Sequence, residues 1–276
     1  MRIPFAQVDA FATRAFEGNP AAVMPLTHWL DDELLQSIAS ENNLSETAFL
    51  VPIANSEDDG GEGPDFELRW FTPAAEVALC GHATLASGHF ILSGDPSRDR
   101  VRFATRQAGV LEVSREPAQA KAGGDGYAMA LPAWTPAPKA MPEIVAALGV
   151  EPVETLWHDK GYALVVVADE AAVRAAAPDG RAVKALGPYV LIVAAQGETS
   201  DIVSRVFTDY FDIPEDPVTG SAHAVMVPYW AEKLGRDRFT AYQASARGGH
   251  VGCEMAGERV VLRGGCVTVI EGTYLL

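Results

Sequence analysis

The chain has 276 residues, a length that suits two domains of ordinary size, each large enough for its own hydrophobic core. Hydrophobic residues make up 48% of the chain, which excludes an intrinsically disordered protein. The formal net charge of −16 makes nucleic acid and anionic membrane surfaces unfavourable partners, because both carry charge of the same sign.

The cysteines and the hydropathy pattern exclude further classes. Cys80, Cys253 and Cys266 lack the paired spacing that is typical of zinc sites or of a disulfide framework. No run of 18 apolar residues is present to span a bilayer, and residues 1–5 lack the apolar core of a signal peptide. We therefore expect a soluble protein of the cytoplasm.

The first half is predicted to hold two helices among several strands. Apolar residues at helical spacing predict helices over 30–38 and 83–92, the first of them stopped at residues 42–43. A loop is expected at 17–20, and a surface loop at 56–65. A first strand is expected to end at 8–11 and another to begin at 47–51, and further strands are expected at 66–71, 101–105 and 109–115.

The second half repeats this pattern after a predicted linker at 117–126. A helix is expected over 222–234, with a kink at Pro228 and its end at Gly235. Strands are expected at 127–131, 162–167, 189–194, 202–207, 239–244 and 259–270. Each half thus has one alanine-rich helix that is apolar on nearly every side and must be surrounded. We predict an α/β (α+β) fold of two similar domains, each a curved sheet or barrel around a central helix.

A short motif occurs twice and supports this duplication. Both copies read Arg-x-Phe-Thr, then a glutamate four positions before a Cys or Thr, then a glycine and an apolar helical run. The copies occupy residues 69–83 and 205–222, half the chain apart. Chance recurrence of common residue types is the alternative explanation.

The duplication predicts where an anion would bind. In each copy the glycine, Gly81 or Gly220, stands at the start of a helix, where backbone N–H groups are free and the helix dipole is positive. If the two domains pack around a pseudo-twofold axis, both helix starts face one cleft. We therefore expect these glycines to let backbone amides approach a small anionic ligand closely.

Several longer segments resemble the phenazine-biosynthesis PhzF-like family. They spread over nearly the whole chain in the order expected for that family, and they are Gly18-Asn19-Pro20-Ala21-Ala22-Val23, Asn43-Leu44-Ser45-Glu46-Thr47-Ala48-Phe49, the segment from Phe71 to Thr84, Glu215-Asp216-Pro217-Val218-Thr219-Gly220-Ser221-Ala222-His223, and Gln243-x-Ser245-x-Arg247-Gly248-Gly249.

The resemblance implies a diaminopimelate-epimerase-like fold with the active site between two domains. We place these domains at 1–118 and 119–276, with a C-terminal strand at about 266–276 that packs with the first. It also implies isomerase chemistry on a small carboxylate metabolite without a metal or an organic cofactor, and a homodimer.

Glu46 is the first candidate for catalysis. It follows a helix end and precedes a buried strand, so its carboxylate can sit in a partly dry cleft. A local capping or pairing role at the turn is the alternative. The resemblance favours catalysis, because PhzF-like isomerases use the glutamate at this position of the motif as general base and acid.

His82, Asp216 and Ser221 complete the predicted catalytic set, and Gly81, Gly220 and Asn19 the predicted substrate-binding set. His82 directly follows the loop glycine, where it can donate to a substrate carboxylate or relay a proton; a supporting histidine behind the site is the alternative. Asp216 and Ser221 resemble the family's remaining site residues. Asp216 also suits helix capping before Pro217.

Cys80 raises the question of thiol chemistry. Cofactor-independent racemases of the implied fold use two thiols, one from each half, but the second copy here carries Thr219 at the matching position. A threonine hydroxyl is too weakly acidic for that role, so Cys80 is interpreted as a small packed residue.

The sequence therefore predicts a one-base isomerase in which Glu46 takes a proton and returns it on the same face. The alternatives are an epimerase or racemase of the same fold, and a ligand-binding or regulatory protein without turnover.

Overall fold

The structure, a computed structural model, describes residues 1–53, 63–116 and 125–276 and divides into two compact units. Unit 1 comprises Met1–Ala130 and Arg263–Leu276, and unit 2 comprises Leu131–Leu262. The predicted boundary between residues 118 and 119 lies outside the described residues, as do most of the predicted linker and of the predicted loop at 56–65. The last two residues of that linker, 125 and 126, instead begin a strand.

Unit 1 is a closed barrel around a helix. Its helices are α1 (Asp32–Asn42) and α2 (Gly81–Gly94). Its strands are β1 (Arg2–Ala10), β2 (Asn19–Pro25), β3 (Glu46–Pro52), β4 (Phe66–Phe71), β5 (Glu76–Val77), β6 (Arg100–Thr105), β7 (Val110–Arg115), β8 (Asp125–Pro132) and most of β17 (Arg259–Leu275). Neighbours pair in the order β17, β1, β2, β3, β4, β6, β7, β8, and β8 pairs again with β17, which closes the ring.

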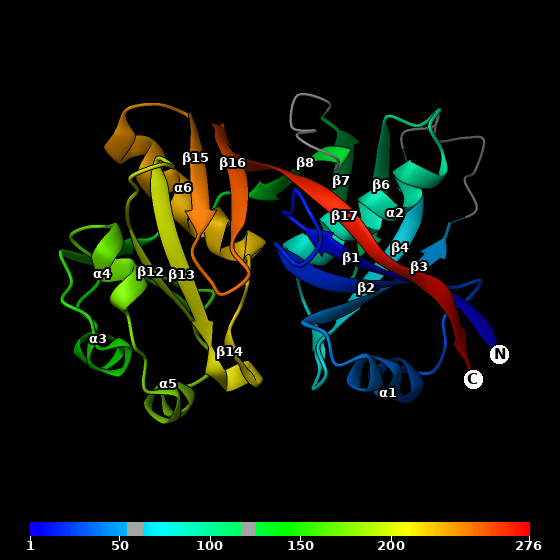
Figure 1. The fold of residues 1–276 in the computed structure, drawn as a ribbon, viewed down its shortest axis with the longest axis horizontal. Helices are drawn as coiled ribbons and strands as arrows, with labels where there is room; N and C mark the ends of the chain where they lie inside the picture. Colours follow the sequence, from blue (N-terminus) through cyan, green and yellow to red (C-terminus); the bar gives the residue numbers. More distant parts are fainter. Residues whose placement is uncertain (54–62, 117–124) are drawn as a thin grey trace. The chain divides into compact units, whose positions relative to one another are not determined.

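Helix α2 lies inside this barrel, as Figure 1 shows, and contacts β1, β2, β3, β6 and β7. Its enclosed hydroxyl groups are satisfied by its own backbone: Thr84 Oγ1 donates to the Cys80 carbonyl at 2.6 Å, and Ser87 Oγ donates to the Ala83 carbonyl at 2.7 Å. Gly88 is needed for close packing, because a Cβ there would lie 2.4 Å from Val113 Cγ1 on β7. The prediction of a surrounded helix is confirmed.

Unit 2 has the same design. Its long helix is α6 (Gly220–Leu234), with short helices α3 (Pro142–Leu148), α4 (Glu170–Ala175), α5 (Gly180–Leu186) and the 3-10 helix η3 (Asp209–Phe211). Its strands are β9 (Ala137–Pro138), β10 (Glu154–His158), β11 (Tyr162–Val166), β12 (Val190–Gln196), β13 (Ile202–Thr208), β14 (Ile213–Glu215), β15 (Arg238–Gln243) and β16 (Gly249–Ala256). Most of α6 is buried, and it contacts β11 and β16.

The strand pairings of the two units match step by step. In unit 1, β1 and β2 are antiparallel, β2 and β3 parallel, β3 and β4 antiparallel, β4 and β6 parallel, and β6 and β7 antiparallel. The same sequence of directions runs through β10, β11, β12, β13, β15 and β16 in unit 2. The repeated motif therefore marks a duplicated fold, and chance recurrence does not explain it.

The motif itself stabilises the turn before each central helix. Arg69 on β4 makes a two-pronged ion pair with Glu76 on β5, from Nε to Oε1 at 2.8 Å and from Nη2 to Oε2 at 2.7 Å. Arg205 on β13 pairs with Glu215 on β14 in the same way, at 2.7 and 2.9 Å. Two parallel hydrogen bonds between an arginine and a carboxylate are charge-assisted, and they are stronger than hydrogen bonds between neutral groups.

The other motif residues also correspond. Each guanidinium lies over the ring of the motif phenylalanine, 5.0 Å from Phe71 and 4.9 Å from Phe207. The motif threonines close the following turns, since Thr72 Oγ1 donates to the Ala75 carbonyl and Thr208 Oγ1 donates to the Ile213 carbonyl. Arg-x-Phe-Thr is therefore a structural motif that positions the helix start downstream of it.

Helices outside the barrels explain the unbroken apolar runs of several strands. In unit 2, residues of α3, α4 and α5 pack with alternate residues of β11 and β12, such as Val165 and Val193, while α6 contacts β11 as well. In unit 1, Leu35 and Ile38 of α1 pack against Phe49 and Phe71. A strand that is buried on both faces has a continuous run of hydrophobic residues. Because the alternation of apolar and polar residues is lost, the sequence pattern does not reveal the outer helices.

Sequence patterns located the long elements well and the short ones poorly. The predicted strand at 66–71 matches β4, and Asn43 and Gly235 end α1 and α6 in the left-handed conformation as expected. The loop predicted at 17–20 is wrong at Asn19 and Pro20, which already belong to β2. No sequence pattern predicts the strands β2, β5, β9, β10, β14 and β16 or the short helices α3, α4 and α5.

The ion pairs of the buried Arg69 should stabilise unit 1 more than the ion pairs of the exposed Arg106. Arg69 and Arg106 both contact Glu76 and Asp32, but their side chains are 3% and 54% exposed. We expect Arg69→Met to lower the free energy of unfolding by about 3 kcal/mol, because it breaks a buried pair, and Arg106→Met to change it by less than about 1 kcal/mol. Urea unfolding measures both; equal losses would contradict this assignment.

Candidate active site

Glu46 is the first residue of β3 and stands at the end of a short reversal of the chain. Helix α1 ends at Asn42, and Asn43 has a φ of 48°, the left-handed conformation that terminates a helix. Asn42 Nδ2 donates to Thr47 Oγ1 at 3.0 Å, which ties the helix end to the strand start. The Glu46 side chain is consequently held in place and is only 13% exposed.

His82 is the second residue of α2 and lies against Glu46. Its side chain is 3% exposed, and Nε2 lies 3.0 Å from Glu46 Oε2, close enough for an ion pair. The other ring nitrogen, Nδ1, lies 3.1 Å from Asn19 Nδ2 and 3.5 Å from Cys80 Sγ. The structure thus brings Glu46, His82 and Asn19 together in unit 1, three of the predicted site residues.

Asn19 reaches this group because of the turn before it. Gly18 has a φ of 64°, and a Cβ there would lie 2.1 Å from the Ala10 carbonyl oxygen, so only glycine fits. Asn19 then pairs with Ala10 at the start of β2 and is fully buried. A flip exchanges the donor and the acceptor of its amide, so Asn19 can meet either a neutral or a charged His82.

The charges in this group favour a protonated His82. Burial alone would lower the pKa of the imidazole, but the charge of the Glu46 carboxylate and the hydrogen bond with the Cys80 sulfur raise it above its ordinary value. Burial and the charge of Glu46 raise the pKa of the Cys80 thiol to about 11, so the thiol keeps its proton near neutral pH. The group is therefore an imidazolium between a carboxylate and a neutral thiol.

Glu46, Cys80 and His82 are also the kinds of residue that bind metal ions, and one ligand atom from each lies within 4.8 Å of the others. The two contacts of His82, however, use different ring nitrogens: Nδ1 faces Cys80 and Nε2 faces Glu46. A single ion bonds to only one nitrogen of a ring, so a chelate would require these side chains to rearrange. The observed geometry fits a chain of proton-carrying groups better than a metal centre.

The start of α2 adds positive potential beside these groups. Its N-cap residue, Cys80, makes no capping hydrogen bond through its side chain, and no acidic residue occupies the first turn. The backbone N–H groups at Gly81 and His82 precede the first intrahelical bond, from Thr84 N to the Cys80 carbonyl. Together with a charged His82, this arrangement suits an anion.

Unit 2 presents a different group at the matching place. Asp216 follows β14, and Thr219 Oγ1 donates to its Oδ2 at 2.5 Å. Gln243, at the end of β15, accepts from Thr219 N at 2.9 Å through Oε1, and its Nε2 donates to the Asp216 carbonyl at 2.6 Å and to Thr219 Oγ1 at 3.2 Å. All three side chains are buried.

Gly220 and Ser221 open α6 as Gly81 and His82 open α2. The N-cap residue Thr219 makes no side-chain capping bond to the helix, and the first turn contains no acidic residue. His223 Nδ1 lies 2.8 Å from the Thr219 carbonyl, where it takes the part of Thr84 in unit 1. Burial lowers the pKa of His223 to about 4, so it is neutral, in contrast to His82.

Sequence reasoning missed two residues of these groups. The sequence predicts only packing for Cys80, but its sulfur also contacts His82. Gln243 enters the sequence analysis only through the family resemblance, although its side chain contacts both Asp216 and Thr219. The first could have been suspected from the Cys-x-His spacing at a helix start, and the second from a glutamine that follows Phe239 and Ala241 on one face of the predicted strand at 239–244.

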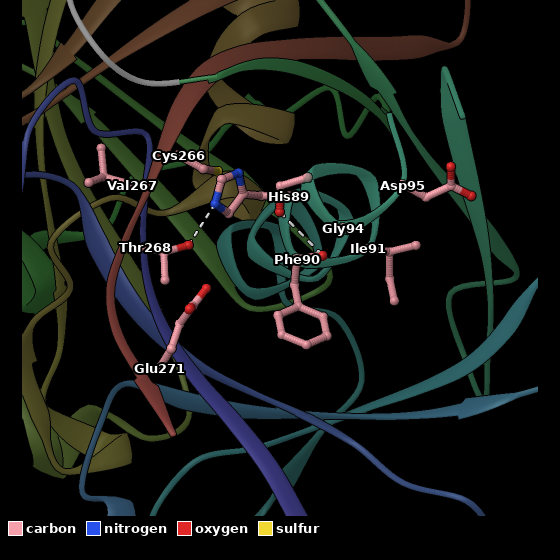
Figure 2. Close-up of a pocket in the computed structure, with 10 residues that line it drawn as sticks. His89, Phe90, Ile91, Gly94, Asp95, Cys266, Val267, Thr268 and Glu271 are labelled. Atoms are coloured by element: carbon pink, nitrogen blue, oxygen red, sulfur yellow. Dashed lines mark hydrogen bonds between the residues drawn. The ribbon is translucent and has the colours of Figure 1, made fainter. Parts of the chain in front are cut away.

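A separate cavity of about 740 Å³ lies toward the other end of α2. Figure 2 shows His89 directed from α2 toward Thr268 on β17, with Glu271 nearby. His89 Nε2 lies 2.8 Å from Thr268 Oγ1, and Nδ1 lies 3.0 Å from the Tyr127 hydroxyl. None of the predicted site residues lines this cavity, and its histidine is bound on both sides, so the groups at Glu46 and at Asp216 remain the candidates for catalysis.

Comparison with known proteins agrees with this fold and with these motifs. The family model described as phenazine biosynthesis-like protein, PhzC-PhzF, matches residues 8–272. The chain belongs to the PhzC-PhzF family. It is 47% identical over 278 residues to "Uncharacterized isomerase PA2770" of Pseudomonas aeruginosa, with all of both chains covered.

Solved structures share this fold. A crystal structure of a PhzF-family phenazine biosynthesis protein from Enterococcus faecalis matches with a TM-score of 0.86 at 39% identity, covering all of both chains. A structure described as a predicted epimerase, PA4716 of Pseudomonas aeruginosa, shares the fold with a TM-score of 0.77 at 18% identity over 99% of each chain. The family and its relatives support an isomerase function.

Within the described ranges, no helix is both long enough and apolar enough to cross a membrane.

The coupling between Glu46 and His82 can be measured directly. We expect Glu46→Gln to lower the pKa of His82, because the variant keeps the shape of the side chain but removes the charge that stabilises the imidazolium. Nitrogen-15 NMR titration of the ring nitrogens measures the change, and His223 in unit 2 serves as an internal control that should not move. An unchanged His82 titration would contradict the proposed ion pair.

Proposed function

We propose that this PhzF-like isomerase moves a proton on a small carboxylate metabolite by one-base catalysis, with Glu46 as base and then acid. The contact between Glu46 Oε2 and His82 Nε2, 3.0 Å at the start of α2, carries the proposal. It places a buried carboxylate beside a positive charge and beside free backbone amides. A base, a cation and an anion-binding helix start are the parts that such a reaction needs.

In the first step the Glu46 carboxylate takes a proton from an acidified carbon of the substrate. The electron pair of the broken C–H bond delocalises into the neighbouring unsaturated group of the substrate. In the second step the protonated Glu46 returns the proton to a different carbon on the same face, and the delocalised pair forms the new C–H bond. Atoms and charges balance without a metal or an organic cofactor.

His82 has two tasks in this scheme. Its positive charge lies 3.0 Å from the Glu46 carboxylate and pairs with it before the substrate loses its proton. Its charge and the amides at the start of α2 also stabilise the negative charge that develops on the substrate. A cation at a helix N-terminus is unfavourable by about 0.3–1 kcal/mol, and the ion pair with Glu46 offsets that cost.

Asn19, Asp216 and Ser221 take supporting roles in the proposal. Asn19 orients the His82 ring through Nδ1. Asp216 and Ser221 accompany the start of α6, where Gly220 and Ser221 offer backbone amides to an anion. We propose that Gly81 and Gly220 are substrate-binding residues, each through the backbone amides at its own helix start, and that the protein acts as a homodimer in the cytoplasm.

Epimerisation by a thiol is the second candidate, because Cys80 Sγ lies 3.5 Å from His82 Nδ1. Two observations weigh against it. The pKa of Cys80 is raised to about 11, so little thiolate is present near neutral pH. In the second copy the matching hydroxyl, that of Thr219, already donates to Asp216.

Solvent-deuterium exchange separates the two candidates. A panel of small carboxylates is incubated with the protein in deuterium oxide, and mass spectrometry detects exchange. Glu46→Gln should lower the exchange rate by roughly two to four orders of magnitude, the range typical of losing a general acid–base. Cys80→Ser should have a mild effect.

The exposed Glu41 of α1 provides a matched control, since Glu41→Gln removes the same charge outside the group and should leave the rate unchanged. The reverse result, an inactive Cys80→Ser and an active Glu46→Gln, would establish thiol chemistry instead. Ligand binding without any exchange would favour a binding protein.

A further inference from the structure

Gln243 is a buried polar side chain of unit 2 with three hydrogen bonds. It is fully buried at the last residue of β15, and both ends of its amide are used. Oε1 accepts from the backbone N–H of Thr219 at 2.9 Å. Since a backbone N–H can only donate, this contact fixes which end of the amide is oxygen.

The orientation of Gln243 sets the direction of the next hydrogen bond. Its Nε2 can only donate, and it lies 3.2 Å from Thr219 Oγ1 and 2.6 Å from the Asp216 carbonyl. The Thr219 hydroxyl therefore accepts from Gln243 and gives its own proton to Asp216 Oδ2, 2.5 Å away. A carboxylate that accepts such a bond is stabilised in its ionised form.

The duplicated fold provides an internal comparison. Gln243 pairs with Ser204, one residue before Arg205, and the residue in the same place in unit 1 is Thr105, which pairs with Leu68, one residue before Arg69. Thr105 only closes the local turn after β6: its hydroxyl donates to the Gly109 carbonyl at 2.8 Å and accepts from Ala108 N at 2.9 Å. The fold can thus be built without a buried glutamine here.

We propose that Gln243 is a positioning residue that acts through Thr219 to hold Asp216 as an ionised hydrogen-bond acceptor. The value of this arrangement for catalysis rests on the proposed function, in which Asp216 supports the substrate site. It also assigns Thr219 a role: the hydroxyl that replaces the second racemase thiol is a donor to Asp216 and carries no proton to or from the substrate.

The test follows the Asp216 carboxyl by carbon-13 NMR in protein labelled at aspartate, with Asp216→Asn identifying its signal. Thr219→Val should raise the titration midpoint of Asp216 by about 1 pH unit, the size expected for losing one hydrogen bond to a charged group. Thr219→Ser keeps the hydroxyl and should restore the midpoint. Gln243→Met, which keeps the volume and removes the amide, should raise it as well.

Thr105→Val is the matched control, since it removes a hydroxyl at the equivalent place in unit 1, and it should leave the Asp216 midpoint unchanged. In the unsubstituted protein the Gln243 side-chain amide signals should shift with the same midpoint as Asp216, a readout that needs no folded variant of Gln243. The inference would be overturned by an unchanged Asp216 midpoint in Thr219→Val, or by Gln243 amide signals that do not shift as Asp216 titrates.

These measurements need no substrate. If Thr219→Val leaves the Asp216 midpoint unchanged while the protein shows normal exchange activity, the positioning role alone is rejected. A positive NMR result with unaffected exchange in Glu46→Gln would reject the proposed function alone.

Discussion

Each unit depends on enclosing a helix that has almost no polar face. Helix α2 is in contact with strands on several sides, and its buried threonine and serine hydroxyls bond to its own backbone. Such a helix is stable only inside a curved sheet, because exposing it to water would lose the hydrophobic stabilisation that its side chains provide. The barrel of unit 1 and the similar sheet of unit 2 follow from this one requirement.

The same requirement determines where chemistry can take place. An enclosed helix has its free backbone N–H groups only at its first turn, and in both α2 and α6 this turn is left without a side-chain cap. The Arg69–Glu76 and Arg205–Glu215 ion pairs hold the turns that lead to these helix starts. The scaffold thus positions two equivalent helix starts, and the side chains beside them determine what each one does.

The two copies then differ in chemistry while they share geometry. The first carries Cys80 and His82 beside Glu46 and contains a charged imidazole. The second carries Thr219 and Ser221 beside Asp216, and its own histidine, His223, is buried and neutral. The duplicated fold occurs twice in the chain, and in the proposed scheme the different side chains at the helix starts suit one copy to holding a base and the other to holding a fixed carboxylate.

Sequence patterns were sufficient for the parts of this account that depend on local signals. The apolar helices, the duplication and Glu46, His82 and Asn19 follow from periodicity, repetition and resemblance, and the structure brings those three residues together. The contacts of Gln243 with Thr219 and Asp216 join residues 24 and 27 positions apart, which no local pattern reveals. The short helices α3, α4 and α5 were missed because each spans only one or two turns, too short for a periodic signal.

The central claim is that one carboxylate both removes and returns the proton. The most direct measurement is a single turnover in deuterium oxide, with mass spectrometry of the product formed from an unlabelled substrate. Because Glu46 is largely buried and holds only the proton it has taken, the account predicts that part of the first product retains protium at the carbon that receives the proton. Complete deuteration of that carbon from the first turnover would contradict it and indicate that a second group, charged from solvent, delivers the proton.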